Sequence, residues 1–222
     1  MKPWGWLAMG LLALLLGGCG DNVFRYKMTV EVDTPQGLKT GSSVWEVRYE
    51  EPGWFPFPFG ESRPQKYFRG EAVAVDIAPG QTLFALKVGK GGDSEYGKFM
   101  PSEMMGWRQD SGVVEGPVEL WPARDAEPML VRFRDINDPT SVEQANPADL
   151  GASFGSGVAL KRIVAEETND PVTTGIEKRL KWLKNYYDNR LNGDRFENMR
   201  KHEISAHLSA GSFTSARLGE SK

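Results

Sequence analysis

Residues 24–32 alternate between apolar and polar side chains without a break, and this pattern constrains the fold more than any other feature of the chain. Successive side chains on a β-strand point to opposite faces, so strict alternation predicts a strand with one buried and one solvated face. Residues 43–50 show a similar alternation after the sequence Asp-Thr-Pro-Gln-Gly at 33–37, which is typical of a turn. The two segments therefore predict an antiparallel hairpin.

A third strand is predicted at residues 67–77, where Val and Ile occupy one face and Gly and Ala the other. The small side chains would let a second layer approach closely, which favours a central place in a sheet. Pro79-Gly80 predicts a tight turn into a strand at residues 82–88. Three further strands and a short helix followed by a Gly-rich loop complete the expected elements; the strands are at residues 113–121, 129–134 and 158–168, and the helix and loop are at 141–154.

The C-terminal part of the chain predicts an amphipathic helix over about residues 175–191. It begins with Thr174-Gly175-Ile176-Glu177, which fits a capping box, and Asn192-Gly193 would end it. Apolar residues then recur at helical spacing, at Ile176, Leu180, Leu183, Tyr187 and Leu191. Lysines and arginines occupy the other side, so the helix could lie on anionic lipid, but an apolar stripe of this width favours packing on a sheet.

These elements predict a mainly β fold, an antiparallel sandwich-like domain with a C-terminal amphipathic helix, and an α+β fold is the alternative. One domain is expected to cover residues 24–222, since the chain has no repeat at a solenoid period. Of the residues, 40% are hydrophobic and 26% charged, as in an ordinary folded domain. The formal net charge of -3 argues against a nucleic-acid partner, which normally requires a basic surface.

The first eighteen residues have the order of a secretory signal peptide: Lys2, then an apolar run at residues 7–16, then small residues. The run is too short to span a bilayer comfortably. The sequence Leu16-Gly17-Gly18-Cys19 resembles the lipobox of bacterial lipoproteins. This resemblance implies cleavage after Gly18, lipid on Cys19, and a short tether over residues 19–23.

The lipobox resemblance also implies a location. The body would be held in the cell envelope by its acyl chains, facing the periplasm. Asp directly after the lipidated Cys is associated with inner-membrane retention, and here Gly20 takes that place, which favours the outer membrane. Cys19 is the single cysteine of the chain, so neither an internal disulfide nor a cysteine zinc site is expected. The body from Arg25 to Trp182 resembles uncharacterised proteobacterial proteins through stretches such as residues 170–177, and that resemblance implies no activity.

The sequence Gly151-Ala152-Ser153-Phe154-Gly155 matches the G-x-S-x-G motif, in which an exposed Ser acts as the nucleophile of α/β-hydrolases. Asp188 or Asp194, and then His202 or His207, follow in the order of a catalytic triad. That motif needs a strand before the Ser and a helix after it, and here the predicted order is reversed. An envelope hydrolase using Ser153 is therefore the alternative hypothesis. The main hypothesis is a non-enzymatic role, for which no catalytic residue is predicted.

Two further patterns could bind metal ions. His202 and His207 are five residues apart, so they would point about 140° apart on a helix and to opposite faces of a strand, and neither arrangement chelates zinc. Asp135, Asn137 and Asp138 offer three side-chain oxygens of the kind that Ca²⁺ prefers, and they resemble part of a cadherin linker motif. The same residues before a proline are typical of an Asx turn, which is the interpretation we favour. No cofactor is expected.

The segment Trp54-Phe55-Pro56-Phe57-Pro58-Phe59 links two predicted strands and alternates Phe with Pro. Proline removes hydrogen-bond donors, so the segment cannot be a central strand. Its aromatic side chains, Trp54, Phe55, Phe57 and Phe59, either form a binding surface for an envelope protein or glycan, or fold back over an open end of the sheet. The sequence thus predicts a lipid-anchored envelope protein with a non-enzymatic binding or structural role.

Overall fold

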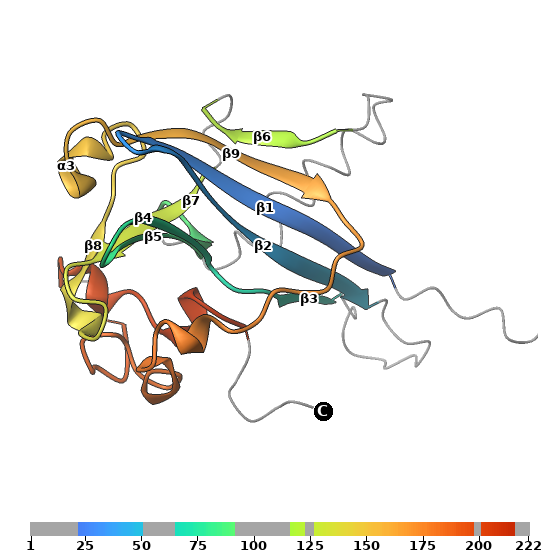
Figure 1. The fold of residues 1–222 in the computed structure, drawn as a ribbon. Coiled ribbons are helices and arrows are strands. Elements are labelled where there is room, and N and C mark those ends of the chain that lie inside the picture. Colours follow the sequence, from blue (N-terminus) through green and yellow to red (C-terminus); the bar gives the residue numbers. More distant parts are fainter. Residues whose placement is uncertain (1–21, 51–64, 92–115, 123–126, 198–200, 216–222) are drawn as a thin grey trace, which may run out of the picture.

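The computed structural model describes residues 22–50, 65–91, 116–122, 127–197 and 201–215, and these form two antiparallel β-sheets (Figure 1). The five-stranded sheet has the order β3-β2-β1-β9-β6, and the four-stranded sheet has the order β4-β5-β7-β8. The mainly β, sandwich-like fold is therefore confirmed. The strands are β1 (Asn22–Thr34), β2 (Gly37–Glu50), β3 (Gln65–Arg69), β4 (Val73–Ala78), β5 (Gln81–Gly89), β6 (Val118–Trp121), β7 (Pro128–Phe133), β8 (Val142–Gln144) and β9 (Ala159–Glu167).

The predicted first hairpin is present as β1 and β2. Thr34 pairs with Gly37, so Pro35 and Gln36 alone form the loop, and Gly37 has a positive φ of 105° that suits glycine. The apolar side chains of the alternating pattern are fully buried from Tyr26 onward. The alternation therefore predicted both the strand and the face that it buries.

The predicted strand at 67–77 is in fact two strands in different sheets. β3 lies at one edge of the five-stranded sheet and β4 at one edge of the four-stranded sheet, so the expected central place is wrong. The chain crosses between the sheets at residues 70–72. The expected close approach is nevertheless present: a Cβ on Gly70 would lie 2.7 Å from the Trp45 ring, and one on Gly41 would lie 2.2 Å from the Ala74 carbonyl oxygen.

The hairpin of β4 and β5 is confirmed, with Pro79-Gly80 as its turn. β6, β7 and β9 form inside or close to the segments predicted for them. The helix predicted within 141–154 is mostly wrong, because β8 begins there and the helix α3 is confined to Gly151–Phe154. β8 adds to β7 through the pairs Phe133–Val142, Arg132–Glu143 and Val131–Gln144. A short 3₁₀ turn, η2 (Pro139–Ser141), connects β7 to it.

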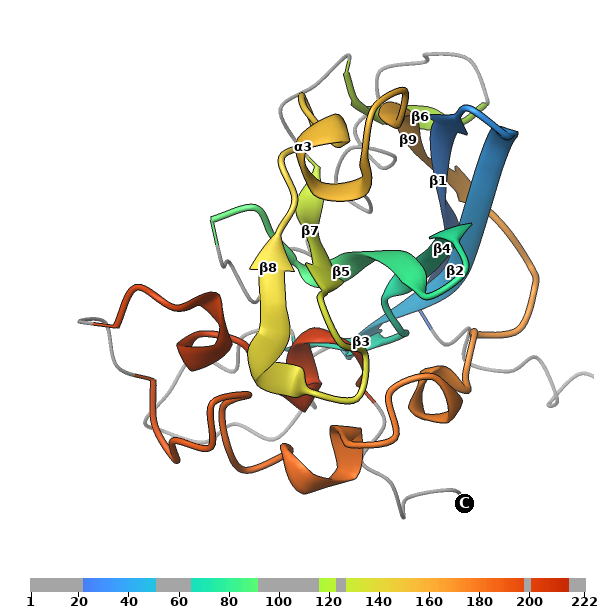
Figure 2. The same cartoon turned by 60° about the vertical axis from the view of Figure 1, so that its left-hand side comes forward.

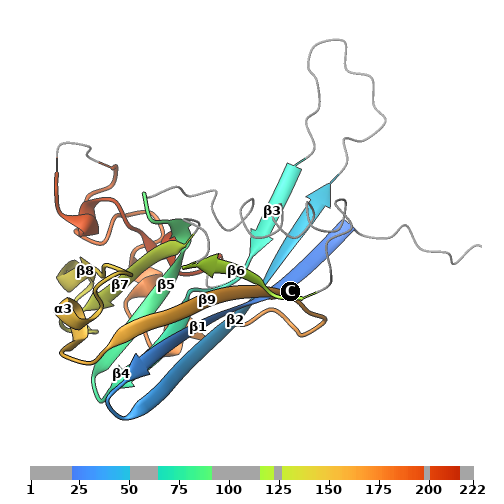
Figure 3. The ribbon, with the colours of Figure 1, turned by 90° about the horizontal axis from the view of Figure 1, so that it is seen from above.

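One hydrophobic core lies between the two sheets. Tyr26 and Trp45 from the five-stranded sheet pack there, in T-shaped contact at 5.7 Å between ring centroids. Val75, Leu83 and Leu130 enter the same core from the four-stranded sheet. The ends of β1 and β2 that carry β3 extend past the four-stranded sheet (Figure 3). This core joins the two sheets into one unit.

A second core covers the other face of the four-stranded sheet. Phe84, Met129 and Phe133 project from the sheet and pack against Leu180 and Phe213 of the C-terminal segment, which we define as residues 176–197 and 201–215. Figure 2 shows this segment, in orange and red, wrapped below the four-stranded sheet. The molecule therefore has three layers, and the C-terminal segment is the third.

The C-terminal segment is not the predicted helix over residues 175–191. Among the described residues it contains only short 3₁₀ turns, which are η3 (Ile176–Lys178), η4 (Leu183–Asn185), η5 (Ile204–Ala206) and η6 (Ala210–Ser212). Leu180 and Trp182 are both buried in the second core. Residues two apart on an α-helix point about 200° apart, so a regular helix would bury one and expose the other. The apolar spacing therefore predicted correctly what is buried, but not the backbone that buries it.

The predicted capping box at Thr174 is also replaced. The carboxylate of Glu71 instead accepts hydrogen bonds from the backbone N–H groups of Gly175 (3.0 Å) and Ile176 (2.8 Å), at the start of η3. Burial raises the pKa of Glu71, while these two N–H groups oppose that rise. The backbone carbonyl of Glu71 also accepts from the Trp45 indole at 2.7 Å. Glu71 thus ties the C-terminal segment to both sheets.

Within the described ranges, no helix is long and apolar enough to cross a membrane. Gly18, Cys19 and the tether up to residue 21 lie outside these ranges, as does the aromatic segment with Trp54, Phe55, Phe57 and Phe59.

Candidate functional site

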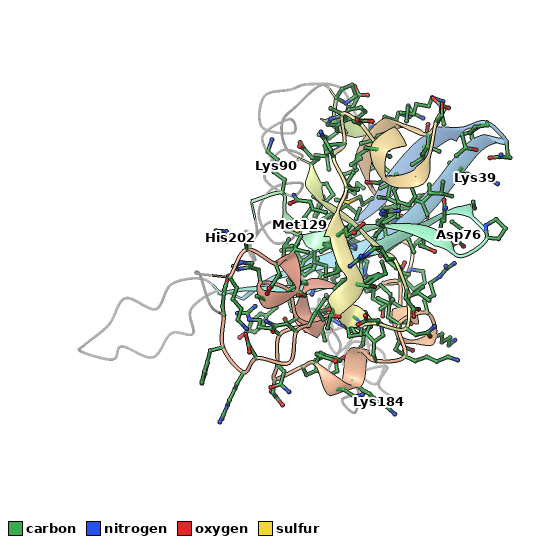
Figure 4. The ribbon with its side chains drawn as sticks, turned by 90° about the vertical axis from the view of Figure 1, so that its left-hand side faces the viewer. Lys39, Asp76, Lys90, Met129, Lys184 and His202 are labelled. Atoms are coloured by element: carbon green, nitrogen blue, oxygen red, sulfur yellow. The ribbon has the colours of Figure 1, made fainter. Side chains whose placement is uncertain are left out.

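A cavity of about 710 Å³ lies between the four-stranded sheet and the C-terminal segment. Its sheet side begins at the end of β5 and continues over Met129 of β7 and Gln144 of β8. Figure 4 shows Lys90, Met129 and His202 on this side of the molecule, away from Lys39, Asp76 and Lys184. Its lining includes Lys87, Val88, Lys90, Met129, Gln144, Arg190, Glu197, His202, Ile204, His207 and Leu208. A cavity of this volume falls in the range that holds a small organic ligand, about 300–1,000 Å³.

Residues 190–197 and 201–209 form one wall of the cavity, and hydrogen bonds join the two ends of this part of the chain. The N–H of Leu191 donates to the carbonyl of Leu208 at 2.9 Å, and Arg190 pairs with Ser209 in an isolated β-bridge. The Arg190 guanidinium adds a hydrogen bond of 2.9 Å to the carbonyl of His207. Loops whose two ends are tied together in this way often carry function. Here the closure holds Arg190 and His207 at the cavity.

Two lysines approach the cavity from the sheet. Lys87 is buried, and its Nζ donates to the Gly211 carbonyl at 3.0 Å and lies 5.3 Å from the centroid of the Phe68 ring. Lys90 lies just beyond β5, with its Nζ 3.3 Å from a carboxylate oxygen of the buried Glu127. A buried ammonium group is costly unless it has hydrogen-bond or charge partners, which these contacts supply.

His207 carries the clearest electrostatic perturbation at the cavity. Its Nδ1 lies 2.9 Å from the Glu197 carboxylate and its Nε2 lies 2.8 Å from the Lys201 carbonyl oxygen. Both partners are acceptors, so only the doubly protonated imidazolium can donate to both. The Glu197 carboxylate, and then the Lys201 carbonyl, therefore raise the pKa of His207, while burial and the nearby Arg190 charge oppose the rise. His202 is exposed and lines the same cavity.

A second cavity of about 350 Å³ adjoins the first, and Lys90 and Gln144 line both. Glu127 lies on this smaller cavity, and its buried Oε2 has no hydrogen-bond partner. Gln144 donates from its side-chain amide to the backbone carbonyl of Lys90 at 3.2 Å. Lys90 and Gln144 therefore form a polar boundary between the two spaces.

The structure does not bring Ser153 together with the predicted triad partners. Ser153 lies in α3, its N–H donates to the Leu150 carbonyl at 3.0 Å, and its own carbonyl accepts from the Arg132 guanidinium. Figures 1 and 2 show α3 apart from the red part of the C-terminal segment, which carries the histidines. Both ring nitrogens of His207 already face Glu197 and Lys201. Of the candidate aspartates, Asp194 is bound to Lys201 at 2.6 Å.

The calcium candidates Asp135 and Asp138 accept hydrogen bonds from neighbouring residues of their own turn. Asp135 accepts a hydrogen bond of 2.9 Å from the N–H of Asn137, and Asp138 accepts from the N–H (2.9 Å) and hydroxyl (2.7 Å) of Thr140. The hydroxyl and N–H of Thr140 lower the pKa of Asp138, which caps η2. This is the Asx-turn geometry that we favoured from the sequence. In the part of the chain that the structure describes, no three His, Cys, Asp or Glu side chains are placed to hold a metal ion.

Comparisons with known proteins give little further guidance. No family model matches the chain, and no solved structure matches it. One curated protein, an arginine repressor from Pelotomaculum thermopropionicum, is 28% identical over 123 residues, which is 54% of this chain and 79% of the repressor. An identity at this level does not show a family, so the class that fold and site define is a three-layered, mainly β domain with a cavity beneath its second sheet.

Sequence reasoning missed this cavity. The spacing of the two histidines excluded a zinc site and indicated no other role for them, and neither Lys87 nor Arg190 was singled out. One signal was available: Lys87 interrupts the apolar sequence of β5, where Val88 and Leu86 are buried beside it. A charged residue inside a buried strand is rarely placed there without a partner or a function.

Proposed function

We propose that the protein is a lipid-anchored binding protein of the cell envelope that faces the periplasm. The lipobox at residues 16–19 supports the anchor, since Cys19 is the single cysteine of the chain and stands at the position that is lipidated. Two or three acyl chains would hold the body at the membrane, because each buried CH₂ contributes about 0.8 kcal/mol. Gly20 after the cysteine favours the outer membrane over the inner one.

The cavity of about 710 Å³ is the observation that supports a binding role best. Its walls combine apolar side chains with a few charged groups, which is the usual composition of a ligand site. Its charged groups lie in paired contacts, as Lys90 with Glu127 and His207 with Glu197. The aromatic segment at residues 54–59 is a second proposed contact surface, for an envelope protein or glycan.

Two other roles have less support. A hydrolase that uses Ser153 would need a base beside it, and both ring nitrogens of His207 already face Glu197 and Lys201. A repressor role would follow from the printed name of the matched relative. The net charge of -3 does not favour nucleic acid, and the α-helix of the described residues, α3, has four residues.

Mass spectrometry of the protein purified from envelope fractions tests the anchor. We expect a chain that begins at Cys19 and carries acyl groups. Cys19→Ala should instead retain residues 1–18 and carry no lipid, because the thiol is the site of attachment, whereas Gly20→Ala should still be lipidated. A wild-type chain that keeps its first eighteen residues, or that lacks acyl groups, would contradict the proposal.

A further inference from the structure

The cavity beneath the four-stranded sheet has one apolar part. Val88 and Met129 line it from the sheet, and Ile204 and Leu208 line it from the C-terminal segment. Val88, Met129 and Leu208 are each less than a tenth exposed, so this part of the wall is continuous with the second core. It can therefore shelter the apolar body of a ligand from water.

The rest of the wall is cationic. Lys87, Lys90 and Arg190 come from two different layers and line the same space. One carboxylate, that of Glu197, lines it with them, and it is already engaged by Arg190 at 3.2 Å and by His207 at 2.9 Å. Glu127 faces the adjoining cavity across Lys90. The cations exceed the carboxylates, and protonation of His207 increases the excess.

The apolar part and the cationic part of the wall together favour a ligand with a negative charge. Fixed cations in a partly enclosed space attract an anion more strongly than they would in bulk water, because the local dielectric constant is lower. The same groups repel a cationic ligand and leave a neutral one without electrostatic gain.

We propose that this cavity binds an organic anion: a carboxylate, phosphate or sulfonate group near Lys87, Lys90 and Arg190, on an apolar body that packs against Met129 and Leu208. The inference rests on the proposed function as a binding protein and adds the ligand class.

Isothermal titration of the full-length lipoprotein in neutral detergent micelles tests the proposal, with heats from empty micelles subtracted. The probes are naphthalene-2-sulfonate and naphthalene-2-sulfonamide, which share one apolar body and differ in charge. We expect the sulfonate to bind about tenfold more tightly, and its affinity to fall with added sodium chloride while that of the sulfonamide stays constant. Equal affinities, or no binding of the sulfonate, would overturn the proposal without touching the lipid anchor.

A variant series locates the site. Lys90→Gln combined with Glu127→Gln leaves no buried carboxylate unpaired. Compared with Glu127→Gln alone, this double variant has lost one cation, and it should bind the sulfonate about three- to fivefold more weakly. The matched controls Lys39→Gln and Lys184→Gln, on lysines remote from the cavity in Figure 4, should leave the affinity unchanged. If the controls weaken binding as much as the double variant, the anion binds elsewhere and the assignment fails. The salt dependence of sulfonate binding is measured on the wild-type protein. It therefore still tests the proposal if a variant fails to fold.

Discussion

Phe213 tests whether the C-terminal segment is a structural layer of the domain. Its side chain is fully buried, and its ring centroid lies 6.2 Å from that of Phe84, 5.8 Å from Phe133 and 5.7 Å from Trp182. The backbone N–H of Ala72 donates to the Phe213 carbonyl at 2.7 Å, and a change of side chain would leave that bond in place. Phe213→Ala therefore removes the ring contacts and their buried area while keeping the backbone attachment.

We expect this substitution to lower the free energy of unfolding by about 4 kcal/mol, within the range of about 3–5 kcal/mol for a buried Phe→Ala change. In a domain of this size the melting temperature should fall by roughly 8–16 °C. The loss is large beside a total stability of about 5–15 kcal/mol. Urea denaturation followed by tryptophan fluorescence measures it, and hydrogen exchange should show faster exchange of the Leu191 amide, which donates to Leu208.

Phe196→Ala is the matched control, because it makes the same chemical change on a side chain that is 75% exposed. It should change stability by about 0.5 kcal/mol or less. If Phe213→Ala were as mild as this control, the second core would not hold the C-terminal segment. The cavity, which depends on that segment for one wall, would then not be a fixed feature of the fold.

Two further predictions concern packing and charge. Gly41→Ala should destabilise the domain by about 1–3 kcal/mol in urea denaturation, because the new Cβ would lie 2.2 Å from the Ala74 carbonyl oxygen. Gly91→Ala is the control, since a Cβ there would lie in open space. If the two variants were equally stable, the two sheets would not make this contact. His207 should titrate above its ordinary value of 6.5 in NMR, since the Glu197 carboxylate raises its pKa. The protonated pair then stabilises the fold fully below that ordinary value, and the contribution is lost as pH rises through the folded-state pKa. Glu197→Gln should lower the midpoint of the His207 titration. If that midpoint did not move, the pairing of His207 with Glu197 would be refuted.

The parts of the fold that the sequence predicts are those set by near neighbours. Alternation over 24–32 fixes which side chains of β1 are buried, and Pro79-Gly80 fixes the turn of the β4–β5 hairpin. Each depends on contacts that the local pattern already contains. The break between β3 and β4 does not depend on the local pattern. It requires Gly70 to pass against the ring of Trp45, which lies in β2.

The C-terminal segment shows why a correct apolar pattern can give the wrong backbone. Ile176, Leu180 and Leu183 are buried as the helical spacing required, but Trp182 is buried with them. Its indole N–H donates to the carbonyl of Ile136 at 2.9 Å, a residue 46 positions earlier, so its place is set by tertiary contact. Once that contact forms, the chain satisfies its backbone through short 3₁₀ turns instead.

The cavity is hidden in the sequence for the same reason. Lys87 meets its acceptor on Gly211, 124 residues later, and the loop that carries Arg190 and His207 is closed by hydrogen bonds between its own ends. No spacing rule joins these positions, since the groups converge only after the second core has formed. A buried cation in an apolar strand is the one part of the site that the sequence displays, and it is also the part that the proposed anion would complement. The binding proposal and the third layer therefore depend on each other: loosening the segment through Phe213 should weaken sulfonate binding even though Phe213 is absent from the residues that line the cavity.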